Sequence, residues 1–153
     1  MKAEYINPFI KASVNLFTQY LGVEVTPGTP YVRSDPEDLE EVSGIIGLAG
    51  ETTGAVVLSF SRETAVELVS RMAKKKYQAL TNEVIDGVGE LVNVIAGNAK
   101  QGLTDFRIDM SLPGIVTGKA YSIHWPEGIP VVAIPFESEL GHFSVNVSLR
   151  DVE

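Results

Sequence analysis

The chain has 153 residues, enough for one domain with its own hydrophobic core. Hydrophobic residues make up 44% of it, as in folded globular proteins, but no apolar run reaches the roughly 18 residues of a membrane-spanning helix. A net charge of -8 argues against nucleic-acid binding, and the absence of cysteine excludes disulfides, zinc–thiolate sites and cysteine nucleophiles. The N-terminus lacks the apolar core of a signal peptide, so a cytoplasmic protein is expected.

A first amphipathic helix is predicted from Ile6 to Leu21. Apolar side chains recur there at helical spacing, and Gly22 is placed to end the helix. The predicted apolar face of this helix consists of Ile6, Phe9, Ile10, Phe17, Tyr20 and Leu21. The proline-rich stretch from Pro27 to Asp38 predicts a broken, partly extended connection.

A β-hairpin and a second helix are predicted to follow this connection. The hairpin strands are expected from Val42 to Ala49 and from Ala55 to Phe60, with a turn at residues 51–54. Ser61 is a typical helix N-cap, and its helix is expected to run to about Lys76. Three consecutive lysines at that point suit the C-terminal end of a helix dipole.

The longest predicted helix, from Asn82 to Leu103, carries the most informative pattern. Its apolar residues form one face, and a turn of about 100° per residue gathers its polar residues on the opposite face. That polar face consists of Glu83, Asp86, Glu90, Asn93, Gly97 and Gln101. A polar face is most often simply solvated. However, glycine inside a helix costs about 1 kcal/mol relative to alanine, so Gly97 favours a face cleared for another protein's surface.

Three further strands are predicted near Ile115 to Ala120, from Pro130 to Phe136 and from His142 to Leu149. Apolar and polar residues alternate in the last of these, which predicts one buried face. Pro135 has no backbone N–H to donate, so its strand is expected at a sheet edge or at a bulge. The predicted fold class is therefore α/β of the α+β type, with two long helices packed on a largely antiparallel sheet.

The two halves of the chain resemble each other at an offset of 78 positions. This offset aligns Asn15 with Asn93, whereas Ala12 aligns with Glu90. Two strand matches accompany it at smaller, drifting offsets: Gly44–Ile46 with Gly114–Val116, and Val56–Phe60 with Val131–Phe136. The pattern predicts a pseudo-twofold repeat of helix-plus-strands units, with the acidic member of the pair present only in the second unit.

The spacing of Asp86, Glu90 and Asn93 resembles the D/S-x3-E-x2-N signature of the CheC/CheX/FliY phosphatases. In that signature a proline follows further along the chain. Pro113 is the candidate here, although it is slightly closer to Asn93 than the usual spacing. The resemblance covers nearly the whole chain, which is expected to form a single domain over residues 1–153. CheC-type members have a usable pair in both halves and CheX-type members keep one, so Ala12 makes the chain resemble the CheX type.

The resemblance implies a homodimeric phosphatase that dephosphorylates the aspartyl phosphate of a CheY-like response regulator. The regulator would supply Mg²⁺, so no cofactor of the phosphatase's own is expected. Asn93 would hold the attacking water, because a carboxamide oxygen accepts from water while its NH₂ donates elsewhere. Glu90 would pair with the regulator's active-site lysine, and Asp86 and Gly97 would belong to the partner-binding surface.

Other functional classes have less support in the sequence. No G-x-S-x-G elbow is present, and His124 and His142 do not form a close metal-binding pair. The serious alternative is a non-catalytic dimeric binding module with the same fold, in which Glu90 and Asn93 are only surface residues. The motif does not encode which response regulator is the partner.

Overall fold

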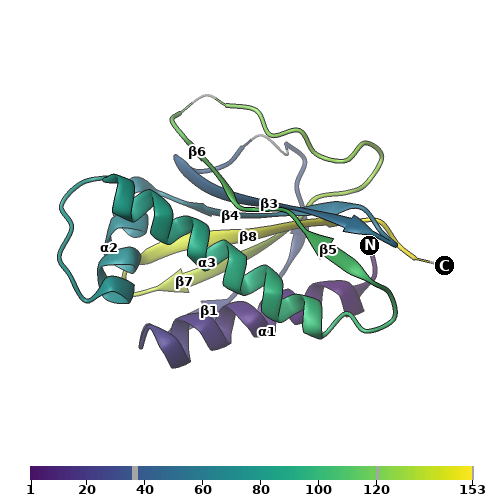
Figure 1. Ribbon diagram of the computed structural model, residues 1–153, viewed down its shortest axis with the longest axis horizontal. Coiled ribbons are helices and arrows are strands. Elements are labelled where there is room, and N and C mark those ends of the chain that lie inside the picture. Colours follow the sequence, from purple (N-terminus) through teal and green to yellow (C-terminus); the bar gives the residue numbers. More distant parts are fainter. Residues whose placement is uncertain (36–37, 120, 153) are drawn as a thin grey trace.

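The computed structural model describes residues 1–35, 38–119 and 121–152, which form a layer of helices on an eight-stranded antiparallel sheet (Figure 1). The helices are α1 (Ala3–Asn15), a π-helical turn η1 (Leu16–Tyr20), α2 (Arg62–Ala73) and α3 (Asn82–Gln101). The strands are β1 (Val25–Pro27), β2 (Tyr31–Val32), β3 (Val42–Gly50), β4 (Gly54–Phe60), β5 (Ile108–Met110), β6 (Gly114–Thr117), β7 (Val132–Ser138) and β8 (Gly141–Leu149). Ala120, the expected end of one strand, lies outside the described residues.

The topology of the sheet confirms the predicted α+β fold and its internal repeat. The strand order is β1-β7-β8-β4-β3-β5, with β2 also paired to β7 and β6 also paired to β3. Each half thus consists of a long helix, two short strands and a hairpin, and the two hairpins meet along β4 and β8. The short strands of each half pair with the hairpin of the other half.

The predicted strand equivalences within the repeat were wrong. The counterpart of β3 is β7, whereas the sequence match had aligned Gly44–Ile46 of β3 with Gly114–Val116 of β6. In the structure these two segments are partners in one ladder, with Gly44 opposite Ile115. Short strands rich in valine and isoleucine resemble one another locally, so their place in a repeat is decided by pairing.

Of the two positions expected for the strand that contains Pro135, a sheet edge or a bulge, the edge was wrong. Strand β7 lies between β8 on one side and β1 and β2 on the other, so it is not an edge strand. The carbonyl of Pro135 accepts a hydrogen bond from the backbone N–H of Gly28 at 2.8 Å. Because the N and C=O of one strand residue point to the same side, the missing N–H faces the gap between β1 and β2. The sheet accommodates the proline where its outer ladder is interrupted.

The hydrophobic core lies between the helices and the sheet and holds α3 in place. Most of the predicted apolar face of α3 is fully buried, as at Val88, Val92 and Ile95, while Ile85 is half-buried. A Cβ on Gly44 of β3 would lie 3.0 Å from Cγ1 of Val92, and one on Gly87 would lie 2.5 Å from Cγ1 of Val69 in α2. Both glycines therefore permit close packing, which fixes the inner side of α3 and turns its polar side outward.

The first helix departs from the prediction at its C-terminal end. Its regular part ends at Asn15, and in η1 the N–H of Leu21 bonds to the carbonyl of Leu16 at 3.3 Å. The wider π turn changes the helical phase. Phe17 remains fully buried, but Tyr20, which regular spacing assigned to the same apolar face, is 75% exposed.

The opposite face of the sheet carries buried polar side chains under irregular segments. Ser43 bonds to the hydroxyl of Tyr121 at 2.6 Å, and Nε of Arg33 donates to Oδ1 of Asn146 at 2.6 Å. Burial raises the pKa of Tyr121 despite its hydrogen bonds to serine hydroxyls. The predicted site lies on the other side of the sheet, on helix α3.

Candidate functional site

Helix α3 is a rigid support for the side chains that the sequence singled out. It runs for 20 residues, and the hydroxyl of Thr81 caps it by accepting from the N–H of Val84 at 3.3 Å. The pKa of Glu83 lies below its ordinary value, because its carboxylate accepts hydrogen bonds from its own backbone N–H and from Thr81. A capped, uninterrupted helix holds side chains in fixed relation better than a loop does.

Asp86, Glu90 and Asn93 are all exposed on the outer face of α3, and Gly97 follows one turn later, half-buried. We call these four residues the α3 strip. Within the described residues, no hydrogen bond or ion pair engages the side chain of Glu90 or Asn93. The structure therefore confirms that Glu90 is accessible, and it presents a carboxylate and a carboxamide together to solvent.

Gly97 needs no close packing within the chain. A Cβ added there would meet no atom within 4 Å. In contrast, a Cβ on Gly89 would lie 3.4 Å from Cδ1 of Ile115 and 3.7 Å from the ring of Pro113. The helix is thus packed at Gly89 and open at Gly97, as expected for a strip cleared for another molecule.

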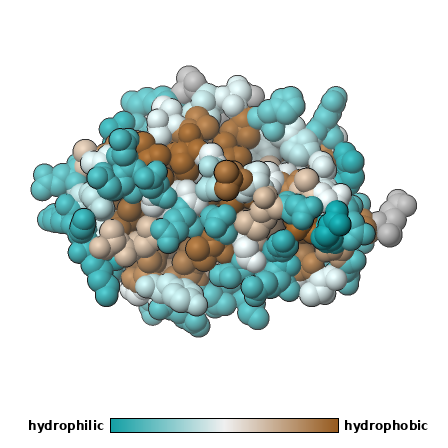
Figure 2. All heavy atoms as spheres, in the orientation of Figure 1, coloured by the Kyte–Doolittle hydropathy of each residue, from teal (hydrophilic) through white to brown (hydrophobic). Residues whose placement is uncertain are grey.

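The connection between β5 and β6 forms one border of the α3 strip. It is fixed to β3, because the N–H of Gly47 donates to Oγ of Ser111 at 2.8 Å and the N–H of Ser111 donates to the carbonyl of Gly47 at 2.9 Å. Pro113 then packs beside Gly89, one turn before Asn93. Leu112, next to it, is 90% exposed. Figure 2 shows hydrophobic atoms in this area above α3, so the strip has an apolar border that the sequence pattern did not reveal.

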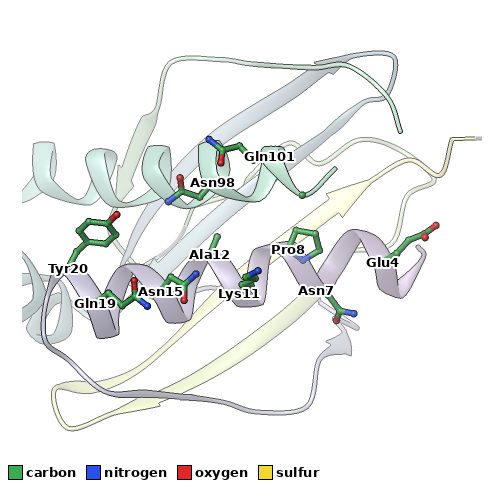
Figure 3. Close-up of a pocket in the computed structure, with 11 residues that line it drawn as sticks. Glu4, Asn7, Pro8, Lys11, Ala12, Asn15, Gln19, Tyr20, Asn98 and Gln101 are labelled. Carbon is green, nitrogen blue, oxygen red and sulfur yellow. The ribbon is translucent and has the colours of Figure 1, made fainter. Parts of the chain in front are cut away.

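The equivalent positions of α1 have a different environment. Ala12 and Asn15, which align with Glu90 and Asn93, line a groove of about 770 Å³ between α1 and α3 (Figure 3). Ala12 is only 4% exposed. The carboxylate–carboxamide pair is therefore present on α3 and not on α1.

The side chains of the α3 strip can position a bound molecule by hydrogen bonds and can pair with a cation. A carboxylate accepts hydrogen bonds and attracts a cation, while a carboxamide both accepts and donates. In the described part of the chain, no three histidine, aspartate or glutamate side chains are grouped to hold a metal ion. Over the same residues, no helix is long and apolar enough to cross a membrane.

Comparison with known proteins identifies the family. The family model described as chemotaxis phosphatase CheX matches residues 42–137. The chain belongs to the CheX family of chemotaxis phosphatases. The CheY-P phosphatase CheX of Thermotoga maritima is 30% identical over 126 residues, which cover 80% of this chain and 81% of that protein.

Solved CheX structures have the same fold over nearly their whole length. The chemotaxis protein CheX of Vibrio vulnificus is 30% identical, with a TM-score of 0.88 over 97% of this chain and all of its own. The CheX of Borrelia burgdorferi, in a complex with CheY, BeF₃ and Mg²⁺, is 28% identical, with a TM-score of 0.81. That match covers 96% of this chain and 98% of the Borrelia chain.

Proposed function

We propose that this protein, acting as one CheX domain over residues 1–153, dephosphorylates the aspartyl phosphate of a CheY-like response regulator. Membership of the CheX family, a relative that is a CheY-P phosphatase and the Borrelia CheX–CheY complex support this function. The observation that carries the proposal is the exposed Glu90–Asn93 pair on α3.

In this proposal Asn93 is the residue that positions water. An aspartyl phosphate is an acyl phosphate, which water already attacks readily, and the regulator supplies Mg²⁺ and a lysine that hold the phosphoryl oxygens. What the phosphatase adds is a water held in line with the phosphorus. The carboxamide oxygen of Asn93 can accept from that water, and ordering it lowers the entropic part of the barrier.

Glu90 sets the docking register in the same proposal. Its carboxylate pairs with the regulator's active-site lysine by a charge-assisted hydrogen bond, roughly twice as strong as a neutral one. Asp86 adds a second negative charge one turn earlier on the same face. Gly97 leaves room for the regulator's backbone one turn after Asn93, because a side chain there has no neighbour within the chain.

We also propose that the protein is a homodimer that works in the cytoplasm. Strands β5 and β6 pair with β3 on one side only, so they leave backbone groups at the sheet edge for a second strand. Sedimentation at micromolar concentration tests this part of the proposal. A monomer at that concentration would contradict it.

The experiment that tests the activity measures phosphate loss from a phosphorylated response regulator with Mg²⁺, with and without the protein. Faster loss in its presence supports a phosphatase. Binding of the regulator with an unchanged rate of phosphate loss would favour the non-catalytic binding module. Comparing several regulators identifies the substrate.

A further inference from the structure

Helices α1 and α3 pack side by side and antiparallel (Figure 1). Their register is fixed where a Cβ on Gly102 would lie 3.0 Å from Cβ of Pro8. Helices α1 and α3 rise by about 1.5 Å per residue, and the five-residue π turn η1 follows α1, so equal steps from this contact remain close to level with each other. Tyr20 lies twelve residues after Pro8, and Glu90 lies twelve residues before Gly102. The register therefore places Tyr20 beside the turn of α3 that carries Glu90.

Tyr20 has the characteristics of a docking residue. Its side chain is 75% exposed, and in the described part of the chain it has no ring contact or hydrogen bond of its side chain with another residue. It ends the π turn η1, a type of turn found frequently at functional sites. Tyrosine is enriched among the residues that contribute most to protein–protein binding.

The groove that Tyr20 borders is lined mainly by carboxamides, with Lys11 and Glu4 further toward the N-terminus of α1. Asn15 lines it from α1, Gln19 from η1, and Asn98 and Gln101 from α3. Figure 3 shows Tyr20 and Asn98 directed into the space between the two helices. Carboxamides both donate and accept hydrogen bonds, so they can pair with backbone amides and carbonyls without selecting a charge.

The groove lies close to the place where the regulator is proposed to dock. Asn98 is five residues beyond Asn93, which is about 8 Å along the helix axis and about 140° around it, on the side of α3 that faces the groove. A specific interface buries about 800 Å² on each partner, equivalent to a disc of about 16 Å radius. A regulator centred on Glu90 and Asn93 would therefore also cover Tyr20 and the mouth of the groove.

We propose that the groove between α1 and α3 is the specificity-determining part of the regulator-binding surface. It binds a surface segment of the regulator through hydrogen bonds to the segment's backbone, with Tyr20 as the aromatic anchor at its edge. The inference rests on the proposed function of the α3 strip. It assigns recognition to the groove between α1 and α3 and leaves the chemistry to the α3 strip.

Steady-state kinetics with the phosphorylated regulator test this assignment. Tyr20→Ala and Asn98→Ala should each raise KM about fivefold or more, with kcat within about twofold, because the lost contacts are the same in the ground and transition states. Tyr20→Phe should keep the parental KM, since the ring is the part that the regulator would cover. Tyr31→Ala is the matched control, because Tyr31 is also an exposed tyrosine but lies on β2, away from both helices.

A binding measurement separates recognition of the regulator from its dephosphorylation. The regulator activated by BeF₃ and Mg²⁺ should bind Asn93→Ala, and adding Tyr20→Ala should weaken that binding about fivefold or more. Parental KM values for both folded variants, Tyr20→Ala and Asn98→Ala, would overturn the groove assignment while leaving the phosphatase intact. A Tyr20→Ala variant that changes the sedimentation coefficient but not KM would overturn it in favour of an interface between copies. A parental protein without any phosphatase activity would refute both proposals.

Discussion

Helices α1 and α3 occupy equivalent places in the two halves of this fold but present different side chains. The offset of 78 positions pairs Asp86 with Pro8, Glu90 with Ala12, Asn93 with Asn15 and Gly97 with Gln19. On α3 these residues form an exposed strip, and on α1 their counterparts line the groove between the helices. The comparison shows that the two halves of one repeated scaffold can differ, with a carboxylate–carboxamide pair on one helix only.

The two helices also differ in how firmly their residues are held. Helix α3 begins at a side-chain cap and continues without interruption for 20 residues. Helix α1 lacks a side-chain cap, contains Pro8 and passes into a π turn. Regular geometry suits the water-positioning role proposed for Asn93, whereas the irregular end of α1 leaves Tyr20 exposed, as the proposed contact with the regulator requires.

The largest expected effect comes from removing the carboxamide of α3. Asn93→Ala should lower the rate of regulator dephosphorylation by about a hundredfold, because the attacking water is no longer positioned. The side chain is exposed, so no cavity forms and the melting temperature should not change. Phosphate release and thermal unfolding are measured on the same preparation. A folded variant with the parental rate would rule out this role for Asn93.

A smaller effect is expected at Glu90, which separates docking from chemistry. Glu90→Ala should raise KM and lower kcat, and Glu90→Gln should fall between Ala and the parental protein, because a neutral amide makes a weaker bond to a lysine. Thermal stability should stay the same, since Glu90 makes no ion pair within the described residues. Equal kinetics for Glu90→Gln and the parental protein would contradict the charge-assisted contact.

Gly97→Gln copies the α1 residue onto α3 and should weaken docking moderately. The fold should tolerate the change, because a Cβ at Gly97 meets nothing within 4 Å, and replacing a helical glycine adds up to about 1 kcal/mol of stability. KM for the phosphorylated regulator should rise while the melting temperature stays equal or increases. Gly97→Ala is the control with a smaller side chain. An unchanged KM for Gly97→Gln would show that the regulator does not approach this turn.

The smallest expected effect is at the α1 counterpart of Asn93. Asn15→Ala should change kcat by less than about twofold, because Ala12 supplies no carboxylate beside Asn15. A modest rise in KM is compatible with its place in the groove. Initial rates at saturating regulator concentration isolate kcat from that contribution.

The sequence predicted well what depends on local periodicity. Helical phase alone placed Glu90 and Asn93 on the exposed face and Val92 in the core, because that phase stays constant along an uninterrupted α-helix. It failed at Tyr20, because the i→i+5 bonding of η1 shifts the phase without an evident sequence signal. The strands β1, β2 and β5 were missed because two or three residues are too few to show alternation.

The sequence pattern did not predict contacts between residues far apart in the chain. The groove brings Ala12 next to Asn98, 86 positions apart in the chain, and no periodicity within either helix specifies that approach. The edge position expected for Pro135 was wrong for the same reason. A proline lacks one backbone hydrogen bond on one side of its strand. The structure shows that β1 and β2 both pair with β7 on that side.

The most direct measurement compares single-turnover loss of phosphate from one phosphorylated CheY-like regulator, with Mg²⁺ and a saturating excess of parental protein, Asn93→Ala or Asn15→Ala. Parental protein and Asn15→Ala should accelerate the loss to similar rates, while Asn93→Ala should leave it close to the regulator's own rate. A folded Asn93→Ala that accelerates the loss as much as the parental protein, or a folded Asn15→Ala as inactive as Asn93→Ala, would contradict a single catalytic pair on α3.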